Sequence, residues 1–527
     1  MLCSRTADAA PASLAESGLH GALDAGRRPV YVYVLTTTRV PQYVAQGFRE
    51  PRWWLWCLAY LVFVVYGSLV PLEWREVPWD DALTRFSNIR YLDLGAASRA
   101  DWVANIVLYV PLAFLACCWL FGLRAQGLLA PIAAVLVFLG CVAIAIAVEF
   151  TQIFFDPRTD SLNDLLAEGI GAAIGVSIWL FGRWRIVRLG VDFARGGRAS
   201  VLAALAVFSV GYLLLSLFPY DFVVSRAELH SVLGSRGDGV FSFGCANWLR
   251  CAAFWLVEVL AIAPLGLLLA LLYPRWRLVS MFALGIGIGL VLEPLQLLLV
   301  SGTSHVWSVL FRGLGVLLGA LLGRLLTTRL DIGTFAALAW RSVPWLVVPY
   351  VLAVSGLSGW WNGAWSGFAH AGRQLANLGW VPFYYHYWTS EPVAMASLLS
   401  QLAMYAPIGM AFWARTAAGF GRGGAWWPAM VAALLAVVIE VGKLFAPGTR
   451  PDPTNLIIAP TGAWLAYGAA IWFGRVLAES GPTSFATRPV PADVSRRAAV
   501  APGPAEHMLA GVPRGPQPEP DASAARS

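Results

Sequence analysis

Charged residues are scarce in this chain. They make up 13% of its 527 residues, whereas an ordinary soluble protein carries about 25%. Apolar and aromatic residues make up 58%, and apolar runs near twenty residues recur, each long enough to cross a hydrocarbon core of roughly 30 Å. The composition excludes an ordinary soluble protein and predicts an all-α, polytopic membrane protein.

Motifs of several enzyme and cofactor-binding classes are also lacking. The sequence has no G-x-x-x-x-G-K-[ST] phosphate loop, no H-E-x-x-H and no G-x-S-x-G, which argues against an ATP-driven pump or a membrane metalloprotease. No two of its His lie three or four residues apart, and its Cys form no C-x-x-C, so we expect no metal and no cofactor. Nucleic acid is not an expected partner, because the basic residues are scattered between apolar runs.

Twelve apolar runs are the predicted transmembrane spans. They cover residues 53–70, 102–122, 128–152, 163–182, 200–219, 251–273, 278–300, 308–327, 342–358, 393–413, 425–446 and 454–473. The predicted inner loops, together with the inner end of span 308–327, hold thirteen Arg against Asp192 and Asp331, and the outer segments hold more acids than bases. By the positive-inside rule, we expect a multi-pass protein of the cell membrane with both termini in the cytoplasm.

Two polar tails flank the spans, at residues 1–52 and 478–527. The second holds nine Pro, too many for a helix, and is predicted to be disordered. Cys245 and Cys251 fall on the predicted outer side, where they either form a disulfide or stay free.

An internal repeat appears when the second, sixth and tenth spans are aligned. Each set has a polar residue six before a Pro, then a Glu, a Gln or Lys three later, and a further polar residue fifteen after the Glu. These positions hold Asn105, Glu149, Gln152 and Asp164; then Glu258, Glu293, Gln296 and Ser308; then Gln401, Glu440, Lys443 and Asn455. The register predicts three parallel four-helix units, 53–199, 200–341 and 342–477, which we name the first, second and third unit.

The sharpest polar segment lies at residues 148–175 of the first unit. Glu149 and Gln152 share one helix face, and Arg158 leads into the next predicted helix. With Asn105 ahead of a Pro, the pattern resembles the VanZ-like family, named for the teicoplanin resistance protein, over residues 53–182. The resemblance implies an integral membrane protein linked to glycopeptide resistance or the cell envelope. The candidate ligand-binding residues that it gives are Asn105, Glu149, Gln152, Arg158, Asn163 and Asp164.

The second and third units resemble this pattern in degraded form. In the second, Gly302 stands where the Arg would be and Ser308 replaces the Asp. In the third, Lys443 replaces the Gln, Arg450 comes one place late, and Asn455 replaces the Asp. Only the first unit keeps the complete set, so we expect a functional site there.

The polar residues of the first unit have two interpretations. In one, they form a pocket open to the outer face, in which Glu149 accepts a hydrogen bond or proton and Arg158 binds an anion. In the other, Arg158 pairs with Glu149 or Asp164 and locks two helix ends. Capping explains part of the pattern in either case, because Ser161-x-x-Asp164 is a capping box.

Other features have mainly structural interpretations. Gly171-x-x-x-Gly175 is typical of close helix packing in lipid, and Lys443 is expected to pair with Glu440. The aromatic segment 360–388 fits an anchor at the headgroup level, or alternatively a surface that stacks on a sugar or an isoprenoid chain.

Three functions follow from these observations. The first is a non-enzymatic membrane protein, with membrane lipids as partners, that binds or moves an anionic amphipathic molecule such as a lipid-linked envelope precursor. The second is an enzyme that acts on such a headgroup with Glu149 or Asp164 as general base. The third is a membrane scaffold whose polar residues only pack and cap.

Overall fold

The computed structural model describes residues 51–91, 95–236, 248–302, 305–328, 331–421 and 424–479. Both predicted tails fall outside these ranges except at their inner edges. The described elements are almost all helices, so the predicted all-α fold is confirmed. The helices are α2 (Trp53–Leu69), α3 (Trp79–Ser87), α4 (Ala96–Phe121), α5 (Leu129–Gln152), α6 (Leu162–Arg195), α7 (Gly197–Ser216), α8 (Arg226–Arg236), α9 (Trp248–Leu272), α10 (Leu278–Leu297), α11 (Val306–Thr328), α12 (Ile332–Leu357), α13 (Phe368–Ala376), α14 (Tyr384–Tyr387), α15 (Glu391–Ala417), α16 (Trp426–Lys443) and α17 (Asn455–Glu479).

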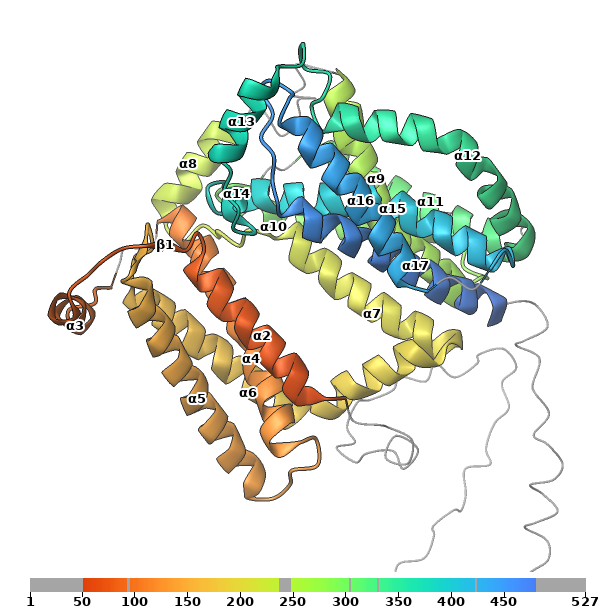
Figure 1. Cartoon of the computed structure of the whole chain (residues 1–527). Helices are drawn as coiled ribbons and strands as arrows, with labels where there is room; N and C mark the ends of the chain where they lie inside the picture. The colour runs from red at the N-terminus through yellow and green to blue at the C-terminus, as the bar shows by residue number, and fades with distance from the viewer. Residues whose placement is uncertain are drawn as a thin grey trace, which may run out of the picture. The chain divides into compact units, whose positions relative to one another are not determined.

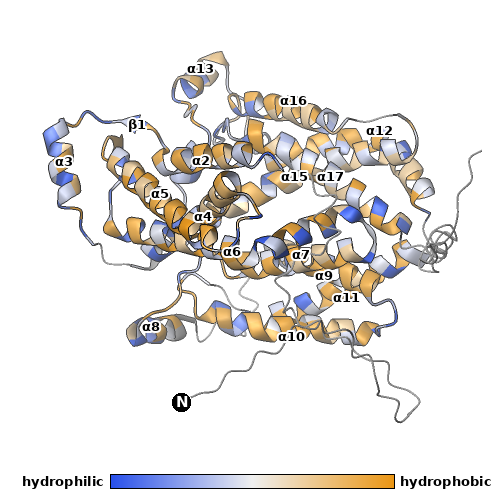
Figure 2. Cartoon of the chain, turned by 90° about the horizontal axis from the view of Figure 1, so that it is seen from below, coloured by the Kyte–Doolittle hydropathy of each residue, from blue (hydrophilic) through white to orange (hydrophobic). Residues whose placement is uncertain are grey.

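Eleven of the described helices are long and apolar enough to cross a membrane. The remaining predicted span falls on α2, an apolar helix whose 17 residues make it shorter than those eleven. Figure 2 shows hydrophobic colour along the long helices, whereas the short helix α3 is mostly hydrophilic. The chain is therefore a polytopic membrane protein.

Two helices extend ten or more residues beyond their predicted spans. α6 continues to Arg195. Polar residues such as Arg are adequate helix formers, so the helix can continue after the apolar run ends. α12 begins ten residues earlier than predicted, since Asp331 caps it by accepting a hydrogen bond from the Thr334 N–H (2.8 Å). The unit boundaries drawn after residues 199 and 341 consequently fall inside α7 and α12.

Glycines let the second and fourth long helices of each unit pack closely. A Cβ on Gly171 of α6 would overlap the Ile106 carbonyl oxygen of α4. Gly315 meets α9 and Gly462 meets α15 in the same way, again at a backbone carbonyl. This is the packing role that the sequence indicated. Figure 1 shows α2, α4, α5 and α6 lying together, and this group carries the site described below.

A short sheet fixes the connection between α5 and α6. Strands β1 (Glu73–Trp74) and β2 (Phe155–Asp156) pair antiparallel, with Glu73 opposite Asp156. Arg75 reinforces the pairing by donating to the Ile153 carbonyl (2.6 Å) and to Oδ1 of Asp156 (2.7 Å). The chain between the two helices is thereby held over the end of α2.

Candidate functional site

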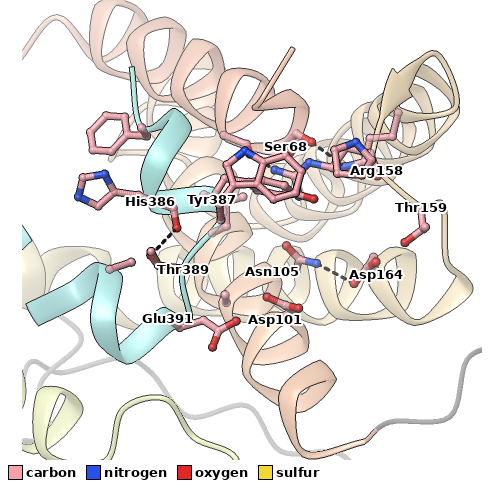
Figure 3. A pocket seen from close by; sticks show the side chains of 18 of the residues that line it. Ser68, Asp101, Asn105, Arg158, Thr159, Asp164, His386, Tyr387, Thr389 and Glu391 are labelled. Carbon is pink, nitrogen blue, oxygen red and sulfur yellow. Dashed lines mark hydrogen bonds between the residues drawn. The ribbon is translucent and has the colours of Figure 1, made fainter. Parts of the chain in front are cut away.

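A cavity of about 770 Å³ lies where α2 and α5 end and where α4, α6 and α15 begin. Of the six residues that the sequence predicted in the first unit, five line it, and they are Asn105, Glu149, Gln152, Arg158 and Asp164. Asn163 is buried at the start of α6 and does not line the cavity. Figure 3 shows the side chains that converge on this space.

Asp164 is held at the start of α6 by its neighbours. Ser161 caps the helix by accepting a hydrogen bond from the Asp164 N–H (3.2 Å), and its hydroxyl donates to Oδ2 of Asp164 (2.6 Å). Asn105 on α4 donates to Oδ1 of the same carboxylate (2.7 Å), and Figure 3 shows the two side chains facing each other. Ser161 is therefore the N-cap of α6, as the capping-box pattern predicted, and the Asp164 carboxylate joins α6 to α4.

Arg158 fastens the end of α2 rather than pairing with a carboxylate. Its Nε donates to the Val70 carbonyl (2.7 Å) and its Nη2 to the Gly67 carbonyl (2.9 Å). Its guanidinium also lies over the Tyr387 ring, 4.5 Å from the centroid. Burial lowers the pKa of Arg158. Within the described ranges, Arg158 makes no ion pair with Glu149 or Asp164. The interpretation in which such a pair joins two helix ends is therefore wrong.

The two remaining predicted residues of α5 are buried at its C-terminal end. Gln152 donates to the Ser68 carbonyl of α2 (3.0 Å), which satisfies a backbone group at a helix end. Glu149 is only 1% exposed, and its Oε2 accepts a hydrogen bond from the Ser161 N–H (3.2 Å). The carboxylate is thus bound to the first residues of the next helix.

Three further carboxylates line the cavity, and the sequence analysis missed them. Asp101 lies on α4, Glu168 on α6 and Glu391 at the first residue of α15. Figure 3 places Asp101 and Glu391 at the same side of the cavity. Helical spacing offered a signal for two of them, because Glu168 follows Asp164 by four residues and Asp101 precedes Asn105 by four. Nothing in the linear sequence connects Glu391 with the first unit.

The corresponding Glu of the second unit is neutralised by a buried Arg. Oε2 of Glu293 accepts from the His305 N–H (3.0 Å), and its Oε1 accepts from Nη1 of Arg312 (2.6 Å). Arg312 also pairs with Glu258 (3.3 Å) and donates to Oε1 of Gln296 (3.1 Å). Ser308 is buried on the same helix. Three of the four predicted equivalents of this unit, Glu258, Glu293 and Gln296, therefore contact one cation that the sequence analysis did not single out.

The third unit neutralises its Glu with Lys443, as predicted. Nζ of Lys443 donates to Oε1 of Glu440 (2.8 Å), and Asn455 donates to the same oxygen (2.8 Å). Oε2 accepts from the N–H of Asp452 (2.7 Å). In all three units, then, the Glu accepts a hydrogen bond from the N–H twelve residues later.

Within the described residues, neither of the last two predicted equivalents makes a hydrogen bond or an ion pair with this Glu. Arg450 lies over the Tyr385 ring, 5.1 Å from the centroid. Oε1 of Gln401 has no hydrogen-bond partner within the described part of the chain.

A segment of the third unit covers the cavity of the first. The Tyr66 hydroxyl donates to the Pro382 carbonyl (2.7 Å), and the Tyr384 hydroxyl donates to Oε1 of Glu73 (3.0 Å). The neighbouring residues Phe383 and 386–389 line the cavity. The predicted outer aromatic segment thus contributes to the site, a role that residue spacing alone did not indicate.

Two other expectations bear on the site. The described residues include no group of three or more His, Cys, Asp or Glu placed to hold one metal ion. Cys251 is disulfide-bonded, whereas its suggested partner Cys245 lies outside the described residues.

Comparison with curated proteins and with solved structures finds no match for the chain. Comparison with protein families finds that residues 42–184 match the VanZ/LLP1 family. This range includes the short sheet, helices α2 to α5, most of α6, and every first-unit residue that lines the cavity. The protein is therefore a polytopic α-helical membrane protein that contains a VanZ-like segment.

Proposed function

We propose that the VanZ-like segment binds the headgroup of an amphipathic cell-envelope molecule, such as a lipid-linked precursor, in this cavity. The observation that carries the proposal is the convergence of five predicted residues, from three helices and one connection, at the ends of membrane-spanning helices. Headgroups occupy this level of a bilayer. The cavity volume of about 770 Å³ also lies within the range of about 300–1,000 Å³ that is usual for small-molecule sites.

Arg158 is the residue that we propose contacts the anionic part of the headgroup. Its contacts with the described residues use two of its N–H groups, on Nε and Nη2, out of the five that a guanidinium carries. The Tyr387 ring beneath it fixes the plane of the guanidinium. A planar, immobilised donor set of this kind suits a phosphate or carboxylate.

The rim of the cavity suits a ligand that arrives from the membrane. Trp388 lines the cavity and is 53% exposed, and aromatic side chains favour the membrane–water interface. Binding of this kind is the step shared by a protein that holds the molecule and one that moves it.

We further propose that the cavity faces the non-cytoplasmic side of the cell membrane and that both termini are cytoplasmic. The distribution of Arg supports this orientation, as does the disulfide at Cys251, because disulfides persist in oxidising compartments. In intact cells, an impermeant maleimide is expected to label Asp81→Cys above the level of the parent protein. Arg185→Cys, on the opposite side, should be labelled only after permeabilisation, and the reverse pattern would overturn the orientation.

Native mass spectrometry of the purified full-length protein tests the ligand proposal. With phosphatidylglycerol as the probe lipid, Arg158→Gln is expected to reduce retention about tenfold, because a hydrogen bond to a charged group is worth about 1.5–3 kcal/mol. Arg450→Gln is the matched control, since this Arg also lies over a Tyr ring but does not line the cavity. Equal retention by all three proteins, each folded as judged by thermal unfolding, would contradict the proposal.

A further inference from the structure

The buried carboxylates of the first unit lack the internal cation that the other two units have. Glu293 pairs with Arg312, and Glu440 pairs with Lys443. In the first unit, the position of Lys443 is taken by Gln152, and the position of Arg312, nineteen residues after the Glu, is taken by Glu168. The place of a cation is therefore occupied by a second acid.

Among the buried carboxylates of the first unit, Glu168 has the fewest hydrogen-bond partners. It is 2% exposed and lines the cavity, and its Oε2 has no hydrogen-bond partner among the described residues. The Tyr109 hydroxyl lies beside this carboxylate but makes no hydrogen bond of good geometry to it. A buried charge in this state is costly unless something else approaches it.

The other carboxylates that line the cavity also lack an ion-pair partner within the described ranges. None of Asp101, Glu149, Asp164, Glu168 and Glu391 makes an ion pair there with an Arg, Lys or His. The first turns of α6 and α15 stabilise Asp164 and Glu391, because the N-terminal end of a helix dipole is positive. Glu149 lies in the last turn of α5, where the dipole has the opposite effect.

We infer that the ligand itself supplies the missing cation, as a primary ammonium group that binds beside Glu168 while its phosphate contacts Arg158. This inference rests on the proposed function and narrows it to headgroups that carry both a phosphate and a primary amine. An ammonium group fits because its three N–H donors can reach carboxylates that are spread along a wall. The carboxylates are not grouped closely enough to hold a metal ion.

The experiment offers the purified full-length protein two lipids with identical acyl chains, phosphatidylethanolamine and phosphatidylglycerol, and measures retention by native mass spectrometry. The wild type is expected to retain phosphatidylethanolamine about tenfold better. Glu168→Gln should abolish that preference, so that the two lipids are retained equally. Asp160→Asn is the matched control, because it removes a neighbouring negative charge that does not line the cavity, and it should keep the preference.

Two further arms define the chemistry and the source of the amine. Phosphatidylcholine, whose trimethylammonium has no N–H donor, is expected to be retained about as weakly as phosphatidylglycerol. Soluble glucosamine 1-phosphate shares the amine and the phosphate but lacks acyl chains. Its competition with phosphatidylethanolamine would indicate an amino-sugar phosphate, and its failure to compete would indicate a lipid headgroup; both results support the ammonium site.

The outcomes separate this inference from the proposed function. Equal retention of the two lipids, unchanged by Glu168→Gln, overturns the ammonium site alone if Arg158→Gln still reduces both. No effect of Arg158→Gln on either lipid overturns the proposed function. If Glu168→Gln does not fold, Glu391→Gln on the partly exposed start of α15 takes its place, with the same expected loss of preference.

Discussion

The first unit and the other two units bury a Glu at the same place but satisfy it differently. Glu293 and Glu440 each have a cation from their own unit, Arg312 or Lys443, within 2.8 Å. Glu149 accepts a backbone N–H in the same way but lies beside a cavity instead of a cation. The same buried Glu is thus paired with an internal cation in two units and borders a cavity in one.

The comparison also shows that the open unit does not form its cavity alone. The segment that includes α14 of the third unit supplies part of the wall and stacks Tyr387 on Arg158. In the third unit itself, Glu440 is bound by Lys443 and Asn455. A unit whose own Glu is paired with a cation thus contributes wall residues to the cavity of another unit.

The largest effect is expected from removing the cation of the second unit. Arg312→Met leaves the buried Glu293 and the partly buried Glu258 without their partner, and breaking a buried ion pair on one side costs about 3–5 kcal/mol. Thermal unfolding in detergent should show a large loss of stability or failure to purify as a folded protein. Arg324→Met on the same helix, at a more exposed position, is the control. Equal stability of the two variants would mean that the ion pairs of Arg312 with Glu258 and Glu293 do not stabilise the fold.

A smaller loss is expected in the third unit. Lys443→Gln installs the residue that the first unit has, but Glu440 keeps its hydrogen bonds from Asn455 and the Asp452 N–H. We expect a destabilisation of about 2 kcal/mol, in line with one hydrogen bond to a charged group. The double variant with Glu440→Gln should recover part of it, since both charges are then absent. Additive losses in the double variant would contradict a direct pairing.

These effects bear on how far the sequence could predict the molecule. Apolar runs predicted the membrane helices because length and hydropathy are the dominant requirement for crossing a bilayer. Helix ends were harder to predict. Polar residues can continue a helix into water, as in α6, and a cap such as Asp331 begins α12 inside a stretch that hydropathy treats as a loop.

The candidate site was predictable where the repeats align and where the family resemblance added Arg158 and Asn105. Alignment of the units selects positions with like residues, so Glu149, Gln152 and Asp164 were found and lie together. The position nineteen residues after the Glu carries Glu168 in the first unit and Arg312 in the second. Because the residues differ there, an alignment that looks for similar residues does not select this position. The contact between Tyr387 and Arg158 joins residues more than two hundred positions apart, and only tertiary packing reveals it.

The comparison predicts a weak effect of Glu168→Gln on stability. The change removes a buried carboxylate whose Oε2 has no partner in the described structure, so the folded state loses little and gains by avoiding the burial of a charge. We expect a change of less than about 1 kcal/mol, or a slight stabilisation, in the ligand-free protein. Unfolding in detergent after delipidation is the measurement. A loss comparable to that of Arg312→Met would show that Glu168 has a structural partner.

The smallest effect is expected at the contact between the first two units. Arg99 on α4 donates to Oε1 of Glu228 on α8 (2.5 Å), and this contact, with backbone N–H groups, lowers the pKa of Glu228 from 4.5 to about 2. A lowered pKa in the folded state means that the stabilisation is complete above about pH 4.5 and declines as the pH falls toward 2. The wild type should therefore unfold at a higher temperature than Glu228→Gln at pH 6, with the gap narrowing steadily below pH 4.5. Because both side chains are partly exposed, the gap should also shrink in high salt. A gap that is constant with pH would show that the two units are held together by packing alone.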